Sequence, residues 1–276
     1  MSDTPSDRYT HGHHASVVGQ HRRRTAEDAA AFLLPRLEPT MSILDVGCGP
    51  GSITIGLARR VSGGHVTGID VVEEVLGDAS ELADDAGLAN VTFEAGDVYA
   101  LGYDDDSFDV AYAHQVLQHL TDPVRALREL QRVVKPGGLV AVRDADYGTM
   151  VHAPDVPELH RWLALYHEVA TRNDAEADAG RYLYGWYLEA GFEEIEMSAS
   201  TWVFTEPRQV LNWGDSWAQR ITQSSLAKQA VEYGLATAAD LEAIADGWRR
   251  WARLPNAFFT FLHIEALGRV PGAESP

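Results

Sequence analysis

Ile43-Leu44-Asp45-Val46-Gly47-Cys48-Gly49-Pro50-Gly51 is the stretch that decides the fold of this chain. An apolar run that ends in an acid and a glycine-rich turn is typical of a buried strand that leads into a helix at a ligand site. Glycine at positions 47, 49 and 51 allows a tight turn with positive φ and a close approach of the backbone to a ligand. The sequence therefore predicts a nucleotide-like ligand just beyond this strand.

The spacing of these glycines argues against a dinucleotide. A dinucleotide fingerprint reads G-x-G-x-x-G, whereas here the third glycine comes one position early, and Ser52 stands where the fingerprint requires Gly or Ala. NAD and FAD are therefore disfavoured, and an NAD-linked oxidoreductase fails on this spacing.

Two further predicted strands also end in acids. His65–Asp70 reads as the second strand of a βαβ unit, whose terminal Asp70 stands where such a unit places a carboxylate against a ribose diol. A third strand, Val91–Ala95, runs into Gly96 and Asp97. Any one acid could instead cap a helix, and any one glycine could only mark a turn. Because these acids and glycines all follow the ends of successive strands, we favour one ligand site beyond the carboxyl ends of the strands.

The chain resembles the class I S-adenosylmethionine-dependent methyltransferases, in particular the small-molecule branch with ubiquinone-biosynthesis-like signatures. The resemblance is strong from Met41 to Asp144 and rests on the motifs DVGCGPG, GID, GDV, FDVAYAHQVLQHL and VVKPGGLVAV. It implies S-adenosyl-L-methionine as the cofactor.

By this resemblance, the glycine turn would line the methionine part of the cofactor, and Asp70 would hold the ribose hydroxyls. Asp97 with Val98 would hold the adenine. Asp45 would lie by the ammonium group, and His114 would border both cofactor and substrate. The implied cofactor-binding residues are Asp45, Gly47, Cys48, Gly49, Gly51, Asp70, Val71, Gly96, Asp97, Val98, His114, Tyr9 and His21.

Candidate catalytic groups gather after the fourth and fifth predicted strands, residues 108–113 and 139–142. Methyl transfer from a sulfonium is an in-line displacement, so the enzyme mainly aligns the reacting atoms and excludes water. A base is needed only where the nucleophile keeps its proton. The predicted catalytic residues are His114, Tyr147 and Asp144, with Asp146 as a further option. An ion pair with Arg143 is an equally good interpretation of the two acids.

The segment before the glycine turn is rich in histidine. Its residues Tyr9, His11, His13, His14 and His21 lack the Cys or carboxylate spacing of a metal site, so no metal is predicted. In related methyltransferases such a segment folds over the cofactor, which makes residues 1–40 a predicted helical lid, with a mobile tail as the alternative. Within it, Thr25-Ala26-Glu27-Asp28 resembles a capping box for a helix toward Leu34.

Composition narrows the functional class. The formal charge of −19 weighs against a nucleic acid substrate, because phosphate binding requires a basic face. The cluster Arg22-Arg23-Arg24 is interpreted as solvated or paired with Glu27 and Asp28. The single cysteine, Cys48, suits packing better than nucleophilic catalysis. No run approaches membrane-spanning length and no secretion signal is recognised, so a cytoplasmic enzyme is expected.

The predicted architecture is a single α/β domain. It has a Rossmann-like, seven-stranded, mostly parallel sheet with an antiparallel last strand, helices on both faces, a helical cap and the N-terminal lid. The core is assigned to residues 41–206 and 256–270, and the cap insertions to residues 148–180 and 207–255. Trp213, Trp217, Trp248 and Trp251 recur at helical spacing in the second insertion. They are interpreted as cap core, a dimer contact or a wall of the substrate site.

These features predict methylation of a small, apolar or aromatic metabolite, such as a secondary metabolite or quinone-like ring, on oxygen, nitrogen or carbon. The expected partner is a small-molecule methyl acceptor, with no nucleic acid and no membrane, and a homo-oligomer is left open. The alternative is a methyltransferase-like protein that binds the cofactor but has a non-methylating role such as cyclisation, or a regulatory or partner role.

Overall fold

The computed structural model describes residues 7, 8, 10, 19 and 21–272. It contains a seven-stranded sheet in the order β3-β2-β1-β4-β5-β7-β6, in which β7 runs antiparallel to both neighbours and the other pairs are parallel. This confirms the predicted fold. The strands are β1 (Ser42–Val46), β2 (His65–Asp70), β3 (Val91–Ala95), β4 (Phe108–His114), β5 (Val134–Ala153), β6 (Glu194–Phe204) and β7 (Phe258–Arg269).

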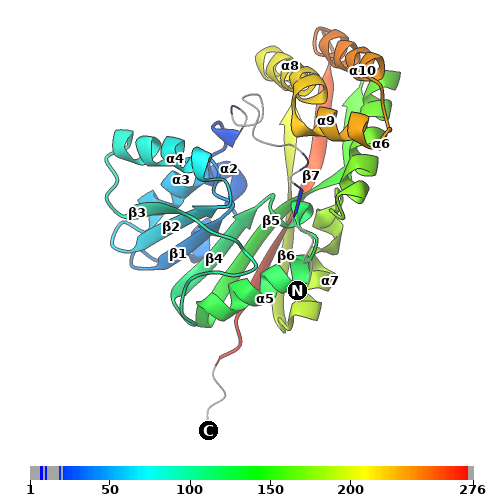
Figure 1. Ribbon diagram of the computed structural model, residues 1–276. Helices are drawn as coiled ribbons and strands as arrows, with labels where there is room; N and C mark the ends of the chain where they lie inside the picture. The colour runs from blue at the N-terminus through cyan, green and yellow to red at the C-terminus, as the bar shows by residue number, and fades with distance from the viewer. Residues whose placement is uncertain (1–6, 9, 11–18, 20, 273–276) are drawn as a thin grey trace.

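Helices cover both faces of the sheet (Figure 1). On one face, α2 (Ala26–Ala29) and α3 (Ser52–Arg60) bury apolar side chains against β1, β2 and β4, and α4 (Glu73–Asp85) packs beside α3. On the other face, α5 (Pro123–Val133) and α7 (Leu183–Ala190) pack on β4, β5 and β7. Because β1 is covered on both sides, its run from Ile43 to Val46 is buried, as expected of a central parallel strand.

The glycine turn joins β1 to α3 with positive φ at each of its three glycines. Gly51, at the N-cap of α3, has a φ of 76°. A Cβ on Gly51 would lie 2.8 Å from the Cβ of Ala79 and 3.0 Å from the ring of Phe93. This glycine therefore lets α3 begin close against α4 and β3.

The fifth strand is much longer than the predicted Leu139–Val142, since β5 spans 20 residues. The polar run from Arg143 to Tyr147 reads as the end of a strand, but antiparallel pairing with β7 continues through Asp146 and resumes at Val151 after an irregularity. β5, β6 and β7 thus extend beyond the other strands and reach the cap (Figure 1). The predicted start of the cap at residue 148 is therefore wrong, because residues 148–153 still belong to β5. Tyr147 also lies within this strand.

The helical cap has its own apolar core. It consists of α6 (Pro157–Arg172), α8 (Pro207–Gln223), α9 (Ser225–Glu232) and α10 (Ala238–Trp251), so both predicted insertions contribute to one cluster. Trp162, Trp217, Trp248 and Trp251 are fully buried in it. Of the tryptophans interpreted from the sequence, Trp217, Trp248 and Trp251 thus belong to the cap core, and edge-on ring contacts with Trp162 and between Trp248 and Trp251 contribute to the packing.

Short helical turns complete the chain. Thr25 caps α2 by accepting a hydrogen bond from the N–H of Asp28, as the sequence predicts, but α2 ends at Ala29 and a separate 3-10 helix spans Leu34–Arg36. Two more 3-10 helices span Leu117–His119 and Ala179–Tyr182. Within the described residues, no helix is long and apolar enough to cross a membrane.

We expect Trp248→Ala to lower the free energy of unfolding by about 3–5 kcal/mol, because it removes a fully buried ring from the cap core. Urea denaturation followed by circular dichroism would measure it. Tyr184→Ala, which truncates a half-exposed ring on α7, is the matched control and should change stability little. Equal effects of the two substitutions would contradict the assignment of a separate cap core.

Candidate functional site

A cavity of about 980 Å³ lies at the carboxyl ends of β1, β2, β3 and β4 and extends to the cap. This volume is at the upper end of the range of roughly 300–1,000 Å³ found for small-molecule sites, so the cavity has room for more than one ligand group. The position is the one expected for ligands of open α/β sheets.

Asp70 holds the glycine turn in place. Its carboxylate accepts one hydrogen bond from the N–H of Gly49 and one from the N–H of Val72, both at 3.0 Å. Each carboxylate oxygen has a second lone pair, so Asp70 can still accept hydrogen bonds from a ligand in the cavity.

Backbone alone borders the cavity at Gly49. A Cβ there would meet no protein atom within 4 Å, whereas one on Gly47 would lie 2.5 Å from Cγ2 of Val116. Both glycines line the cavity. Gly51 is not among the residues that line the cavity, and it lies close against α4 and β3, as described above.

Asp45 brings a buried acid to the same edge. Thr54 donates a hydrogen bond of 2.6 Å to one of its oxygens. Burial raises the pKa of Asp45 to about 7, although the Thr54 hydrogen bond acts in the opposite direction. Neighbouring Cys48 is also buried, and burial raises the pKa of its thiol, which indicates packing and not nucleophilic chemistry.

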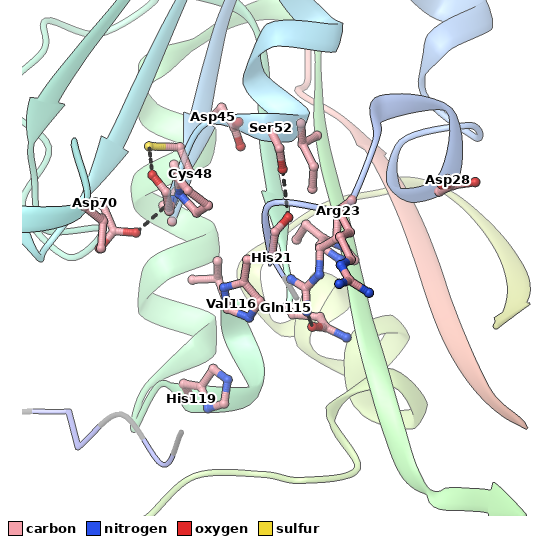
Figure 2. Close-up of a pocket in the computed structure, with 18 of the residues that line it drawn as sticks. His21, Arg23, Asp28, Asp45, Cys48, Ser52, Asp70, Gln115, Val116 and His119 are labelled. Atoms are coloured by element: carbon pink, nitrogen blue, oxygen red, sulfur yellow. Dashed lines mark hydrogen bonds between the residues drawn. The ribbon is translucent and has the colours of Figure 1, made fainter. Parts of the chain in front are cut away.

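The remaining predicted cofactor residues also reach the cavity. Figure 2 shows Asp45, Cys48 and Asp70 around the glycine turn. At the end of β3, Asp97 accepts a hydrogen bond of 2.9 Å from the N–H of Tyr99. Together with these residues, the cavity is lined by Val71, Gly96 and Val98.

The N-terminal segment contacts the site. Ser52 donates a hydrogen bond of 2.9 Å to the carbonyl of His21, which lines the cavity (Figure 2). Arg22 is paired with Asp78 and about half exposed. Arg24 instead turns inward, so the interpretation of the whole arginine cluster as solvated is wrong. Tyr9, His11, His13 and His14 lie outside the described residues.

Aromatic side chains form the far part of the cavity. They include Tyr147 on β5, Trp202 on β6, Phe261 on β7, and Trp213 and Trp217 on α8. Tyr147 stacks on Tyr166 with ring centroids 4.1 Å apart, and burial raises the pKa of its hydroxyl. Trp202 was missed by sequence reasoning, because alternation along β6 does not show which face meets the cavity.

His114 lies at the end of β4, where the two parts of the cavity meet. It is 6% exposed, and its Nδ1 is 3.5 Å from Nη1 of Arg143. Burial, followed by the positive charges of Arg24 and Arg143, lowers the pKa of His114 well below its usual value. The ring is therefore neutral at neutral pH.

Neither predicted acid pairs with Arg143. The buried guanidinium of Arg143 instead forms an ion pair of 3.3 Å with Glu265 of β7, and Asp146 pairs with Arg181. Asp144 is fully buried and is not among the residues that line the cavity. Successive strand residues point to opposite faces, so Asp144 faces away from Arg143. The structure therefore does not place Asp144 at the cavity, whereas Tyr147 and His114 line it.

Gln115 and His119 are two further cavity residues on the segment after β4 (Figure 2). Burial, with a smaller effect of Arg24, lowers the pKa of His119 to about 3, so it is neutral at neutral pH. Gln115 has a φ of 55°, an unfavourable conformation for a residue with a side chain, and such conformations occur mainly at functional sites.

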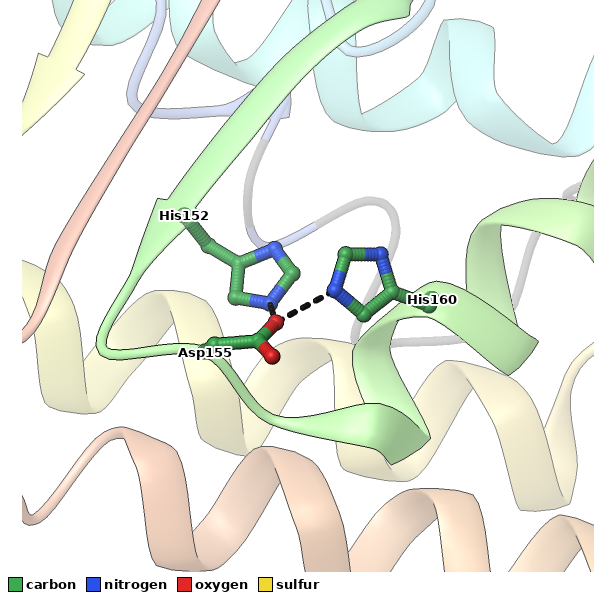
Figure 3. A group of neighbouring side chains, drawn as sticks. All are labelled: His152, Asp155 and His160. Carbon is green, nitrogen blue, oxygen red and sulfur yellow. Dashed lines mark hydrogen bonds and ion pairs between the residues drawn. The ribbon is translucent and has the colours of Figure 1, made fainter.

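A group with metal-binding side chain types lies elsewhere, among His152, Asp155 and His160 (Figure 3). Asp155 and His160 are exposed and 2.5 Å apart, and the rings of His152 and His160 are in contact. These contacts are those of a surface ion pair beside a second ring. None of the three residues lines the cavity.

The charges that line the cavity are separated. Asp45, Asp70 and Asp97 lie at the ends of β1, β2 and β3, while Arg24 and Arg220 lie beside the aromatic part. The acidic part suits a ligand with positive groups and ribose hydroxyls. The aromatic part suits a flat ligand whose charge is not positive.

Comparisons with known proteins agree with this geometry. A family model described as a methyltransferase domain matches residues 37–198. An uncharacterised methyltransferase of Schizosaccharomyces pombe is 35% identical over 259 residues, covering 90% of this chain and 91% of the relative. The probable methyltransferase ltbC of Aspergillus luteorubrus is 31% identical over 281 residues, covering 95% and 97%.

Among solved structures, the [4+2]-cyclase SpnF has a similar fold, with a TM-score of 0.52 and 25% identity over 91% of this chain and 85% of that one. The family model and the two relatives decide the assignment. The chain belongs to the S-adenosylmethionine-dependent methyltransferases, with S-adenosylmethionine as its cofactor.

Proposed function

We propose that this methyltransferase acts on a small, apolar or aromatic metabolite, which enters the aromatic part of the cavity. The observation that carries the proposal is the joining of an acidic, glycine-lined part to a part lined by Tyr147, Trp202 and Trp213 in one cavity. The cytoplasmic location and the role in secondary metabolism expected from the sequence belong to the same proposal.

The residues at the strand ends fit S-adenosylmethionine. The open space in front of Gly49 admits a ligand close to the backbone, and Asp70 keeps free lone pairs for the ribose hydroxyls. Asp45 is a buried carboxylate with a raised pKa, which a nearby positive group would help to ionise. We assign Asp97 and Val98 to the adenine. When bound, the cofactor supplies an electrophilic methyl group on a sulfonium.

The chain's own contribution to the reaction is mainly positional. Stacked Tyr147 and the α8 tryptophans offer flat surfaces against which a ring can be held in line with the methyl group. The N-terminal segment, through His21 and Arg24, covers part of the cavity and would exclude water. We therefore assign it the role of a lid.

The experiment is a methylation assay with S-adenosylmethionine and a panel of aromatic and apolar acceptors, preceded by calorimetric titration with S-adenosylmethionine, S-adenosylhomocysteine and NAD. We expect both adenosyl compounds to bind, NAD not to bind, and methylated product to form with aromatic acceptors. The similarity to a [4+2]-cyclase favours one alternative. Tight adenosyl binding without methylation of any acceptor would support such a non-methylating role.

Gly49→Ala should weaken S-adenosylhomocysteine binding at least about tenfold, or 1.4 kcal/mol, because the added methyl group enters the open space at the cavity. Gly87→Ala is a matched control. Gly87 also has a positive φ and open surroundings but does not line the cavity. Each substitution should cost about 1–2 kcal/mol of stability, so titration calorimetry separates the two roles. Equal affinity of both variants would remove Gly49 from the cofactor site.

The affinity for S-adenosylhomocysteine should rise with pH up to about pH 7 and then level off. Asp45 has its folded-state pKa raised to about 7, so below that pH it is protonated and its proton must leave before it can pair with the ligand's ammonium group. Where Asp45 controls binding, the dependence is about tenfold per pH unit. Calorimetry in several buffers would also detect the released proton.

Asp45→Asn should remove this pH dependence, whereas His21→Gln, which changes another titratable residue of the cavity, should keep it. A slope that persists in Asp45→Asn would show that a different group controls binding.

A further inference from the structure

His114 carries a buried ring nitrogen beside the cavity. Among the described residues, its Nε2 has no hydrogen-bond partner and is shielded from solvent. The side chain lines the cavity between the acidic and aromatic parts. Buried polar groups nearly always have a partner, so this nitrogen indicates the position of a polar ligand atom.

The contact with Arg143 determines which nitrogen carries the proton. An arginine side chain can only donate hydrogen bonds, so Nδ1 of His114 must accept from Nη1 of Arg143 at 3.5 Å. Since the ring is neutral, its proton is on Nε2. Arg143 is itself held by Glu265 and by Ser200, whose Oγ lies 3.0 Å from Nη2. The Nε2–H of His114 is therefore a hydrogen-bond donor that has no partner among the described residues.

A second arginine, Arg24, brings a positive charge to the same part of the cavity. Arg24 donates to Oε1 of Gln115 at 2.5 Å, which leaves the Gln115 amide N–H to donate to Nε2 of His263 at 2.8 Å. The guanidinium of Arg24 also lies 5.5 Å from the centre of the Trp202 ring. This part of the cavity thus combines a cation, a buried donor and an aromatic surface.

We propose that the methyl acceptor carries an acidic oxygen of the phenol or enol type, bound in its ionised form by the Nε2–H of His114 beside the Arg24 guanidinium. The inference rests on the proposed function and names its substrate class. In this proposal His114 binds the methyl acceptor as a hydrogen-bond donor. It does not act as a general base, which is the role that a histidine would suggest. An acceptor bound already ionised needs no base, which agrees with the absence of Asp144 from the cavity lining.

The first test is nitrogen NMR of histidine-labelled protein without ligand. Comparison with His114→Gln identifies the His114 signals. We expect the neutral Nε2–H form at neutral pH. The Nδ1–H form or an imidazolium would overturn the proposal, and neither result depends on cofactor binding.

The second test compares binding of 4-nitrophenol and 4-nitroanisole, with and without S-adenosylhomocysteine. The two probes differ in whether the oxygen can ionise. We expect the phenolate to bind more tightly, with the pKa of bound 4-nitrophenol lowered by about one unit or more. Absent binding of the phenolate, or equal binding of both probes, would overturn the proposal. S-adenosylhomocysteine binding in the same experiment shows separately whether the proposed function itself fails.

Binding of the same two probes to variants tests the contribution of each residue. His114→Leu should weaken phenolate binding about tenfold or more while leaving 4-nitroanisole unchanged, since hydrogen bonds to charged groups are among the strongest. His114→Gln, which can still donate, should restore part of the affinity. Arg24→Gln should also weaken phenolate binding. His160→Gln, an exposed histidine outside the cavity, is the control and should change neither probe. Equal loss for both probes in His114→Leu would indicate a merely structural role.

Discussion

The site depends on one carboxylate that holds two backbone N–H groups. Asp70, at the end of β2, accepts hydrogen bonds from Gly49 in the turn after β1 and from Val72 before α4. The bond from Gly49 ties the ends of β1 and β2 together and holds the backbone of Gly49 at the cavity, while the bond from Val72 fixes the turn after β2. The cavity edge is consequently made by main chain, which can approach a ligand more closely than side chains allow.

The second constraint is the placement of charge along the cavity. Acids lie at the ends of β1, β2 and β3, and Arg24 and Arg220 lie beside the aromatic surfaces. Arg143 is buried only because Glu265 and Ser200 compensate it. Through its contact with His114, this compensated arginine influences the cavity without lining it.

The long strands connect these two parts. β5, β6 and β7 continue past the other strands and place Tyr147, Trp202 and Phe261 at the cavity, while the cap packs on their far ends. The same tryptophan-rich core therefore packs the cap and supplies Trp213 and Trp217 to the cavity lining. For these two residues, a place in the cap core is compatible with a place in the cavity wall.

The sequence by itself determined the sheet, the cofactor and the placement of Asp45, Gly47, Gly49, Asp70 and Asp97, because local motifs at strand ends meet at one edge of a parallel sheet. The sequence could not show that Gly51 packs on Ala79, because a turn glycine that packs on a helix has the same local pattern as one that faces a ligand.

Only the tertiary structure showed which residues surround the aromatic part of the cavity. The pairing of Arg143 with Glu265, the inward turn of Arg24 and the exclusion of Asp144 depend on residues more than 30 positions away in the chain or on which face of β5 is covered. Side-chain partners of this kind are set by the register between distant strands, and that register leaves no local pattern in the sequence.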